Sequence, residues 1–185
     1  MSLRKIVSGG QTVVDRAALD AALELGIVCG GWCPKGRLAE DGRIASRYPL
    51  TETASEDYAQ RTERNVRDSD GTLIINRGAQ LVGGTAQTRE VAARLNKPCL
   101  VIDLTDPLPS TTIFRWLNTR RVRTLNVAGP RESKQPGISV EAFRYLRDVL
   151  CSLWRPSLSG GMAQRRVETA PPRAKKPANA RSSRR

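Results

Sequence analysis

Short apolar runs alternate with segments of helical periodicity along most of this 185-residue chain. The runs are nearly continuous and are bounded by glycine or polar residues, which is typical of strands buried on both faces of a parallel sheet. They predict strands at residues 4–8, 26–30, 71–76, 98–103 and 123–129.

The segments between the runs carry apolar residues every three or four positions, which predicts helices with one buried face. Phe114 and Val140 fall on two of these faces. Strands that alternate with helices at this spacing form right-handed βαβ units. The sequence therefore predicts an α/β, Rossmann-like, doubly wound fold, with a mainly parallel sheet of about five or more strands and helices on both faces. The helices are expected at residues 14–25, 55–67, 85–95, 110–118 and 139–154.

Three of the predicted strands end in a turn that contains glycine and leads towards a helix. These turns contain Gly9 with Gly10, Gly83 with Gly84, and Gly129. Glycine adopts backbone angles closed to other residues, and the free amides of a helix's first turn attract phosphate. A plain packing turn explains any single one equally well. Since ligands of parallel sheets bind at the carboxyl ends of the strands, three such turns favour an anion site.

The first glycine turn also predicts how the first helix begins. Thr12 is expected to be its N-cap, and Asp15 places negative charge in the first turn, where the helix dipole favours it. Neither the GxGxxG fingerprint nor a Walker lysine loop is present in the chain. Ordinary dinucleotide binding and ATP hydrolysis therefore lose support.

Residues 31–54 form a long polar passage without a sustained period, and we predict a loop there. Loops of this length in compact domains are usually functional. Lys35, Arg37, Glu40 and Asp41 give the passage a charged rim beside Trp32, which suits the edge of a ligand. The alternative is that Trp32 packs into the core while the charges are solvated.

The chain contains no histidine. This removes Ser-His-Asp and Cys-His chemistry and leaves carboxylates as the candidates for acid–base catalysis. The four cysteines, Cys29, Cys33, Cys99 and Cys151, are scattered through apolar contexts. We expect reduced thiols and no metal site.

Positive charge is concentrated at the C-terminal end. Residues 156–185 hold eight Lys or Arg and one Glu, which is +7 of the chain's +13. This segment has too few large apolar residues to offset its ordering entropy, so we expect one domain at residues 1–155 and a basic, disordered tail at 156–185. Nucleic acid is expected to make only weak contacts with the tail, since no aromatic platform or recognition helix supports more.

No apolar run approaches the roughly 20 residues needed to span a bilayer. The first residues, MSLRKIVSGG, also lack the apolar core of a signal peptide. We therefore expect a cytoplasmic protein without a membrane partner.

Six longer motifs occur in order along the chain. They are SGGQT with VDRAAL (8–19), GGWCPKGRLAEDG (30–42), YPLTET (48–53), RTERNVRDSDGTLI (61–74), GGTAQT (83–88) and LNVAGPRES (125–133). Together they resemble the molybdenum cofactor carrier protein family over residues 4–150. That family is similar to the Rossmann-like proteins that include the LOG-type, lysine-decarboxylase-like phosphoribohydrolases.

The resemblance implies that the protein binds molybdenum cofactor, a pterin with a phosphate and a dithiolene-held molybdenum, and protects or transfers it without catalysis. The expected partners are this small anionic ligand and further copies of the chain in a homo-oligomer. The residues that the resemblance places at the cofactor are Gly9, Gly10, Gln11, Thr12, Lys35, Arg37, Gly83, Gly84, Thr85, Thr88, Arg131, Glu132 and Ser133.

One residue departs from the family pattern, which has glycine after GGQT where this chain has Val13. A β-branched side chain restricts the backbone there and would crowd a phosphate held close to that amide. We therefore expect Val13 to weaken cofactor binding.

The alternative function is enzymatic. Gly83, Gly84 and Glu90 match the spacing of the LOG-type signature PGGxGTxxE, whereas its proline and inner Gly-Thr are replaced. In this alternative the protein is a nucleoside monophosphate phosphoribohydrolase, or another nucleotide-binding protein, with Glu90 and Arg89 as catalytic candidates. The competing interpretation makes Glu90 a solvated charge on a helix face.

Overall fold

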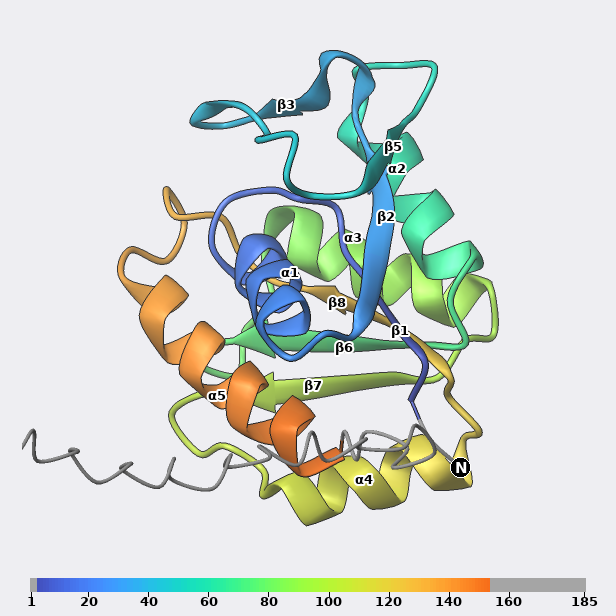
Figure 1. The fold of residues 1–185 in the computed structure, drawn as a ribbon, viewed down its shortest axis with the longest axis vertical. Coiled ribbons are helices and arrows are strands. Elements are labelled where there is room, and N and C mark those ends of the chain that lie inside the picture. Colours follow the sequence, from blue (N-terminus) through green and yellow to red (C-terminus); the bar gives the residue numbers. More distant parts are fainter. Residues whose placement is uncertain (1–2, 154–185) are drawn as a thin grey trace, which may run out of the picture. The chain divides into compact units, whose positions relative to one another are not determined.

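The computed structural model describes residues 3–153. These residues form a six-stranded sheet, five α-helices and a short two-stranded hairpin (Figure 1). No helix among them is long and apolar enough to cross a membrane. The tail predicted at 156–185 lies outside the described residues.

Neighbouring strands of the large sheet are all parallel, in the order β5-β2-β1-β8-β6-β7. The chain winds outward from β1 through β2 to β5, crosses to β6 and β7, and returns to β8 beside β1. This is the predicted α/β, doubly wound, Rossmann-like arrangement. The strands are β1 (Lys5–Val7), β2 (Val28–Cys33), β5 (Leu50–Glu52), β6 (Gly71–Asn76), β7 (Cys99–Asp103) and β8 (Thr124–Ala128).

β6 shows why the apolar runs predicted strands well. Every residue of this strand is buried, because β8 and β7 pair with it on its two sides and helices cover both of its faces. Its bounds agree with the prediction of 71–76. β1, β7 and β8 also lie within their predicted ranges.

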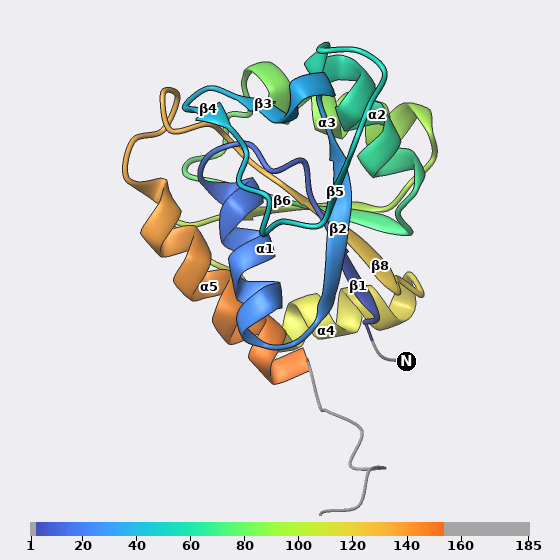
Figure 2. The same cartoon turned by 45° about the horizontal axis from the view of Figure 1, so that its top comes forward.

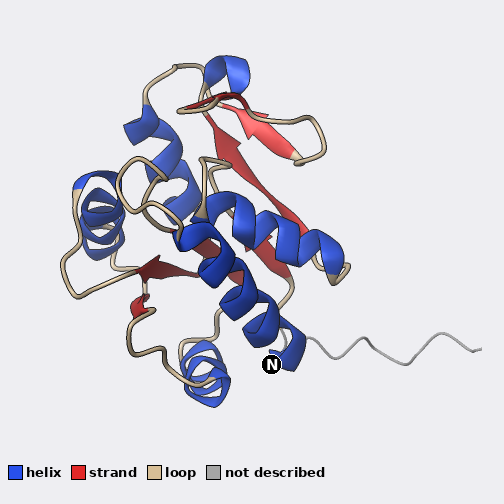
Figure 3. Cartoon of the chain, turned by 90° about the vertical axis from the view of Figure 1, so that its left-hand side faces the viewer, coloured by secondary structure: helices blue, strands red, loops and turns tan. Residues whose placement is uncertain are grey.

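The helices form two layers, and the strands lie between them (Figure 3). α1, α4 and α5 pack on one face around the main core, in which α1 and α5 lie side by side (Figure 2). α2 and α3 pack together on the other face around a smaller cluster of Val66, Val91 and Ala92. The helices are α1 (Val14–Glu24), α2 (Tyr58–Arg67), α3 (Gly83–Arg94), α4 (Ser110–Thr119) and α5 (Ile138–Leu153).

The predicted loop at residues 31–54 is wrong, because it contains regular structure. β2 runs on through Gly30 and Gly31 to Cys33, past the predicted end of that strand, and the edge strand β5 pairs with it. Gly31 is needed because a Cβ there would lie 2.1 Å from the carbonyl oxygen of Ser8, the residue that follows β1. Between β2 and β5 lie a 3-10 turn, η1 (Lys35–Arg37), and the hairpin of β3 (Leu38–Ala39) and β4 (Gly42–Arg43).

The first helix does not begin as predicted. Val13 is the N-cap of α1, with φ 69° and ψ −111°, and no side chain caps the helix. The Thr12 hydroxyl donates to Glu40 on the β3–β4 hairpin instead. A long-range contact has therefore replaced the local cap.

Two predicted core residues are also wrong. Phe114 and Val140 are 49% and 56% exposed, although Leu117 and Leu146 of the same helices are buried. Both exposed residues belong to the apolar stripe of their helix, but that stripe is wider than the part of the helix surface that is buried. Periodicity gives the direction of a buried face but not its width.

The backbone conformation of Val13 predicts that glycine destabilises the protein less than alanine does at this position. A β-branched residue at positive φ is strained by about 1–3 kcal/mol, and only glycine relieves this strain fully. Both Val13→Ala and Val13→Gly should destabilise the protein, since the valine is buried. We expect Val13→Gly to be the more stable of the two by about 1 kcal/mol in urea unfolding.

Val140 provides the control, since it is exposed in the first turn of the regular helix α5. There the alanine variant should be more stable than the glycine variant by about 1 kcal/mol. The same order at both positions would contradict a strained Val13.

Candidate functional site

A pocket of about 300 Å³ lies at the carboxyl ends of β1, β8 and β6, the central strands of the sheet. All three glycine-containing turns contribute to this central pocket, and α2 closes its remaining side. Parallel strands bring these turns together because all their carboxyl ends meet at one edge. Its polar lining includes Gln11, Asp15, Tyr58, Arg61, Thr62, Gly83, Gly84, Thr85, Gln87, Thr88, Arg131, Ser133 and Lys134.

The N-terminus of α3 supplies backbone donors to the pocket. α3 begins at Gly83. The first backbone N–H of this helix with an acceptor is that of Thr85, which donates to the Val82 carbonyl oxygen at 3.2 Å. Within residues 3–153, the N–H groups of Gly83 and Gly84 have no acceptor. A Cβ at either glycine would meet no atom within 4 Å, so the backbone is open to a ligand. Free amides at the positive end of a helix dipole favour an anion.

A buried ion pair forms the floor of the pocket. Arg61 Nη1 lies 3.1 Å from Asp15 Oδ2, and their side chains are only 13% and 3% exposed. The Gln11 N–H donates to the same carboxylate oxygen. Burial raises the pKa of Asp15, and the charge of Arg61 and the hydrogen bonds from Gln11 and Arg61 oppose that rise.

Gly9 makes this ion pair possible. A Cβ at Gly9 would lie 1.8 Å from Arg61 Nη1 and 2.9 Å from Asp15 Oδ2. The first glycine of the turn therefore makes room for a guanidinium of the protein itself. Gly10 has φ +72°, and a Cβ there would meet Leu50 and Ile44.

Two buried donors at the pocket are without a partner in the described part of the chain, Gln11 Nε2 and Arg61 Nε. The orientation of the Gln11 amide follows from its oxygen, which accepts from the N–H groups of Thr12 and Glu40 at 3.1 and 2.9 Å. Buried donors are nearly always paired, so an unpaired donor in a pocket points to a ligand with acceptor atoms.

Cationic side chains give the pocket a positive charge. Asp15 neutralises Arg61, whereas Arg131 and Lys134 on the β8–α5 turn add positive charge to the pocket lining. The Arg131 guanidinium stacks on the Tyr58 ring, with its carbon 4.4 Å from the ring centre. Within residues 3–153 neither Arg131 nor Lys134 forms an ion pair, so the pocket combines two cations, an aromatic ring and several N–H donors.

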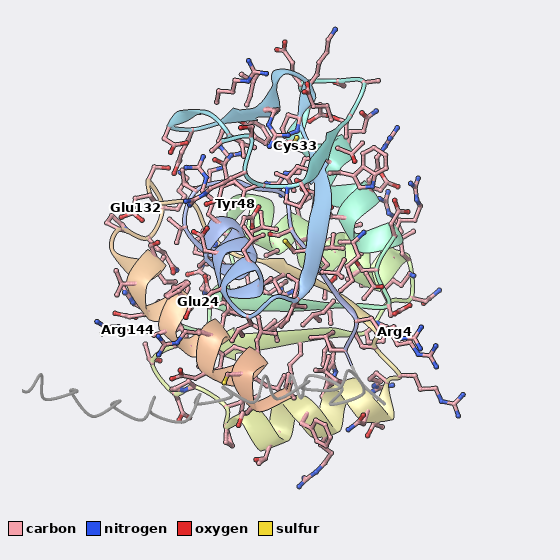
Figure 4. The ribbon with its side chains drawn as sticks, viewed as in Figure 1. Arg4, Glu24, Cys33, Tyr48, Glu132 and Arg144 are labelled. Carbon is pink, nitrogen blue, oxygen red and sulfur yellow. The ribbon has the colours of Figure 1, made fainter. Side chains whose placement is uncertain are left out.

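Several predicted cofactor contacts lie elsewhere. Thr12 and Glu132 line an outer cavity of about 770 Å³ between α1, the β3–β4 hairpin and α5. Figure 4 shows Glu132 on the β8–α5 turn and Tyr48 beside α1, on two sides of this cavity. The Glu132 carboxylate accepts from the Gly137 N–H at 2.7 Å, and Val13 also lines this cavity.

Lys35 and Arg37 line neither cavity. Lys35 is exposed on η1 and does not belong to the three turns that form the pocket. Arg37 donates to the backbone carbonyl oxygens of Ile44, Ala45, Tyr48 and Leu50, so its guanidinium holds the segment between β4 and β5.

Arg89 and Glu90 are exposed on α3. Glu90 lines a hollow with Gln87 and Arg94. Gln87 also lines the central pocket, so the hollow adjoins it, but Glu90 is not part of the pocket lining. Of the described carboxylates, Asp15 alone lines the central pocket, and Arg61 holds it. Residues 3–153 contain no cluster of His, Cys, Asp or Glu that could hold a metal ion.

Sequence reasoning missed Tyr58, Arg61 and Lys134 at the pocket. The buried Asp15 needs a cationic partner, but α2 carries three arginines, and no local pattern distinguishes Arg61 from Arg64 or Arg67. Arg64 instead stacks on Trp32, at 4.6 Å, and Trp32 Nε1 donates to Asp68. Trp32 is thus held against α2.

Comparison with known proteins finds one family and one similar solved structure. The family model described as the circularly permutated YpsA SLOG family matches residues 6–150. A crystal structure named "Putative molybdenum carrier protein", from Syntrophus aciditrophicus SB, shares 48% sequence identity with this chain. The likeness covers 80% of this chain and 94% of the other, with a TM-score of 0.75. No curated protein matches the chain.

The Asp15–Arg61 pair predicts a stability effect that depends on pH. Arg61→Ala leaves a buried carboxylate unpaired and should destabilise the protein by about 3 kcal/mol near pH 7. Without Arg61, burial raises the folded-state pKa of Asp15 further above its unfolded value. The folded variant then binds more protons than the unfolded chain, so its deficit should shrink as pH falls through that folded-state pKa.

Urea unfolding of both proteins at about pH 7 and about pH 5 measures this effect. Arg64→Ala is the control on the same helix, because it removes a stacked surface cation and should cost about 1 kcal/mol or less at either pH. A deficit of Arg61→Ala that is equal at both pH values would show that Asp15 is not the group left unpaired.

Proposed function

Because this chain belongs to the circularly permutated YpsA SLOG family, we propose that it binds a phosphate-bearing pterin, the molybdenum cofactor, and carries it unchanged. The naming of its 48% identical structural neighbour as a putative molybdenum carrier protein supports this cargo. The observation on which the proposal chiefly rests is the central pocket, where free amides, cations and unpaired buried donors converge.

The phosphate end of the cofactor fits the positive side of the pocket. The free N–H groups of Gly83 and Gly84 would donate to phosphate oxygens, and the Thr85 and Thr88 side chains lie in the same lining. Arg131 and Lys134 would neutralise its charge from the opposite turn. This combination of helix N-terminus and cations is how proteins commonly hold phosphate.

The polar edge of a pterin fits the other side. Gln11 Nε2 and Arg61 Nε need acceptor atoms, which a pterin supplies through its ring nitrogens and carbonyl oxygen. The Tyr58 ring carries the Arg131 guanidinium 4.4 Å from its centre, and this planar cation would pack against a flat ring. The volume of about 300 Å³ is at the lower end of small-molecule sites, so the pocket suits one compact ligand.

The placement of the carboxylates favours a carrier over a phosphoribohydrolase. A hydrolase needs a carboxylate that stabilises the charge that develops on the sugar as the base leaves. Glu90 lies outside the central pocket, and the Asp15 carboxylate is engaged by Arg61 and Gln11. The pocket therefore has groups that hold an anion and lacks a free carboxylate that would act on it.

Isothermal titration tests the proposal directly. The wild-type protein should bind molybdenum cofactor, or a stable phosphate-bearing pterin, more tightly than it binds nucleotides or molybdate. Arg131→Ala with Lys134→Ala should weaken this binding at least tenfold, since a charge-assisted hydrogen bond contributes about 1.5–3 kcal/mol. Arg115→Ala with Arg120→Ala, which removes two exposed cations from α4 and its C-cap, is the control with the same change in charge. Absence of binding to every compound, or equal loss in both double variants, would refute a ligand site in this pocket.

The enzymatic alternative predicts a different outcome with nucleotides. We expect no release of free base when the pure protein is incubated with AMP or N6-modified adenosine monophosphates and the products are separated by chromatography. Glu90→Gln serves as the matched variant. Base release by the wild type that is lost in Glu90→Gln would overturn the carrier assignment in favour of a hydrolase.

A further inference from the structure

A second cluster of hydrogen-bond donors lies beside the central pocket, at the tip of the β3–β4 hairpin. There the Glu40 carboxylate lies against two of the three glycine-containing turns. It accepts hydrogen bonds from the Thr12 hydroxyl and, at 2.7 Å, from the Ser133 hydroxyl. The Ser133 N–H approaches it at 3.4 Å. Figure 2 shows the hairpin beside the turn that follows β8.

These donors form a small site that is complementary to an oxyanion. Thr12 and Ser133 come from turns about 120 residues apart, and the Glu132 N–H also donates to the Thr12 hydroxyl, at 3.3 Å. The Thr12 hydroxyl hydrogen points to Glu40, because an ionised carboxylate can only accept, while the hydroxyl oxygen accepts from the Glu132 N–H. The Glu132 carboxylate is turned away, to the Gly137 N–H.

The electrostatic state of Glu40 agrees with this complementarity. Partial burial alone raises the pKa of Glu40, but the hydrogen bonds from Thr12 and Ser133 outweigh that effect and hold the pKa below its usual value. The side chain therefore occupies the site as an anion. Its neighbour Asp41 makes no contact with either turn and instead pairs bidentately with Arg16, at 2.5 and 2.7 Å.

We propose that Thr12, Ser133 and the adjoining backbone amides are an oxyanion site that the Glu40 carboxylate occupies as an internal competitor. The ligand class is a small oxyanion, either a free ion or the anionic group of a larger ligand. Such an anion replaces the carboxylate and releases the hairpin tip from the β8–α5 turn. This site adjoins the phosphate contacts at α3 without coinciding with them, since Thr12 and Glu40 line only the outer cavity, whereas Ser133 lines the central pocket.

Removal of the competitor tests the proposal. Glu40→Ala should lower the thermal unfolding midpoint, and inorganic phosphate, molybdate or formate should restore most of the loss in a saturable manner. Sodium chloride at matched ionic strength should not. Asp41→Ala in an Arg16→Ala background is the control, because it removes the adjacent carboxylate together with the guanidinium that it pairs with and does not open the site. Anions should stabilise this double variant no more than they stabilise the wild type.

Thr12→Val in the Glu40→Ala background should abolish this rescue, because it removes a donor of the oxyanion site that does not line the central pocket. A midpoint of Glu40→Ala that does not respond to oxyanions, or that responds as the double variant Arg16→Ala with Asp41→Ala does, would show that Glu40 only fastens the hairpin. That result overturns the proposal whatever the titration of the wild type with cofactor gives.

If Glu40→Ala does not fold, Glu40→Gln provides the test. Its amide keeps the shape of the side chain but loses the charge and places N–H hydrogens opposite the donors of the site. Isothermal titration with inorganic phosphate should then show binding roughly five- to tenfold tighter than to the wild type. Binding that is no tighter would contradict an internal competitor.

Discussion

The buried ion pair between Asp15 and Arg61 is the contact on which the site depends most. Asp15 lies in the first turn of α1, and Arg61 lies on α2, so the pair joins helices from opposite faces of the sheet. It does so over the end of β1, where Gly9 leaves room for the guanidinium. Each partner depends on the other, because a single charge left in this position would be buried without compensation. The pair thus fixes the distance between the two layers at the edge of the sheet where the pocket lies.

The pocket retains features that do not stabilise the folded protein. Gln11 and Arg61 each keep a buried donor without a partner, and such a donor costs about 1–3 kcal/mol. Val13 adds backbone strain close by. Unpaired buried donors and strained backbone of this kind concentrate at functional sites, where a ligand supplies the missing hydrogen-bond acceptors. A carrier has a particular use for them, because a ligand that satisfies these donors is held firmly without any change in its bonds.

The β3–β4 hairpin links the pocket to the surface of the protein. Gln11 belongs to both, since its side-chain nitrogen is unpaired at the pocket while its oxygen accepts from the Glu40 N–H on the hairpin. Ser133 likewise lines the pocket and donates to the Glu40 carboxylate. A shift of the hairpin therefore reaches two residues of the pocket lining. Glu40 and Ser133 are exposed, and the bond between their side chains exchanges partners more readily than a buried backbone ladder.

Part of this structure could be predicted from the sequence because its causes are local. The run at 71–76 is apolar at nearly every position, which suits a strand covered on both faces, and β6 has those bounds. Glycine turns that follow such strands lie at one edge because parallel strands share a direction. That argument brought Gly83, Gly84 and Gly129 to one pocket without coordinates, and the family resemblance added Gln11 and Arg131. The sequence could not predict that Gly9 makes room for the Arg61 guanidinium, because a glycine does not indicate which side chain packs against it.

The remainder was decided by contacts between residues far apart in the chain. β2 continues through Gly30 and Gly31 because the backbone of β1 passes close beside it, and two glycines carry no apolar pattern to show this. Arg37 was expected at the ligand but binds the carbonyl oxygens between β4 and β5, which were placed there only by the folding of that segment. Arg61 is distinguished from the other arginines of α2 by the position of Asp15 alone. Hydrophobic pattern and turn chemistry act over a few residues, whereas the partner of a polar side chain depends on which segments the finished fold brings together.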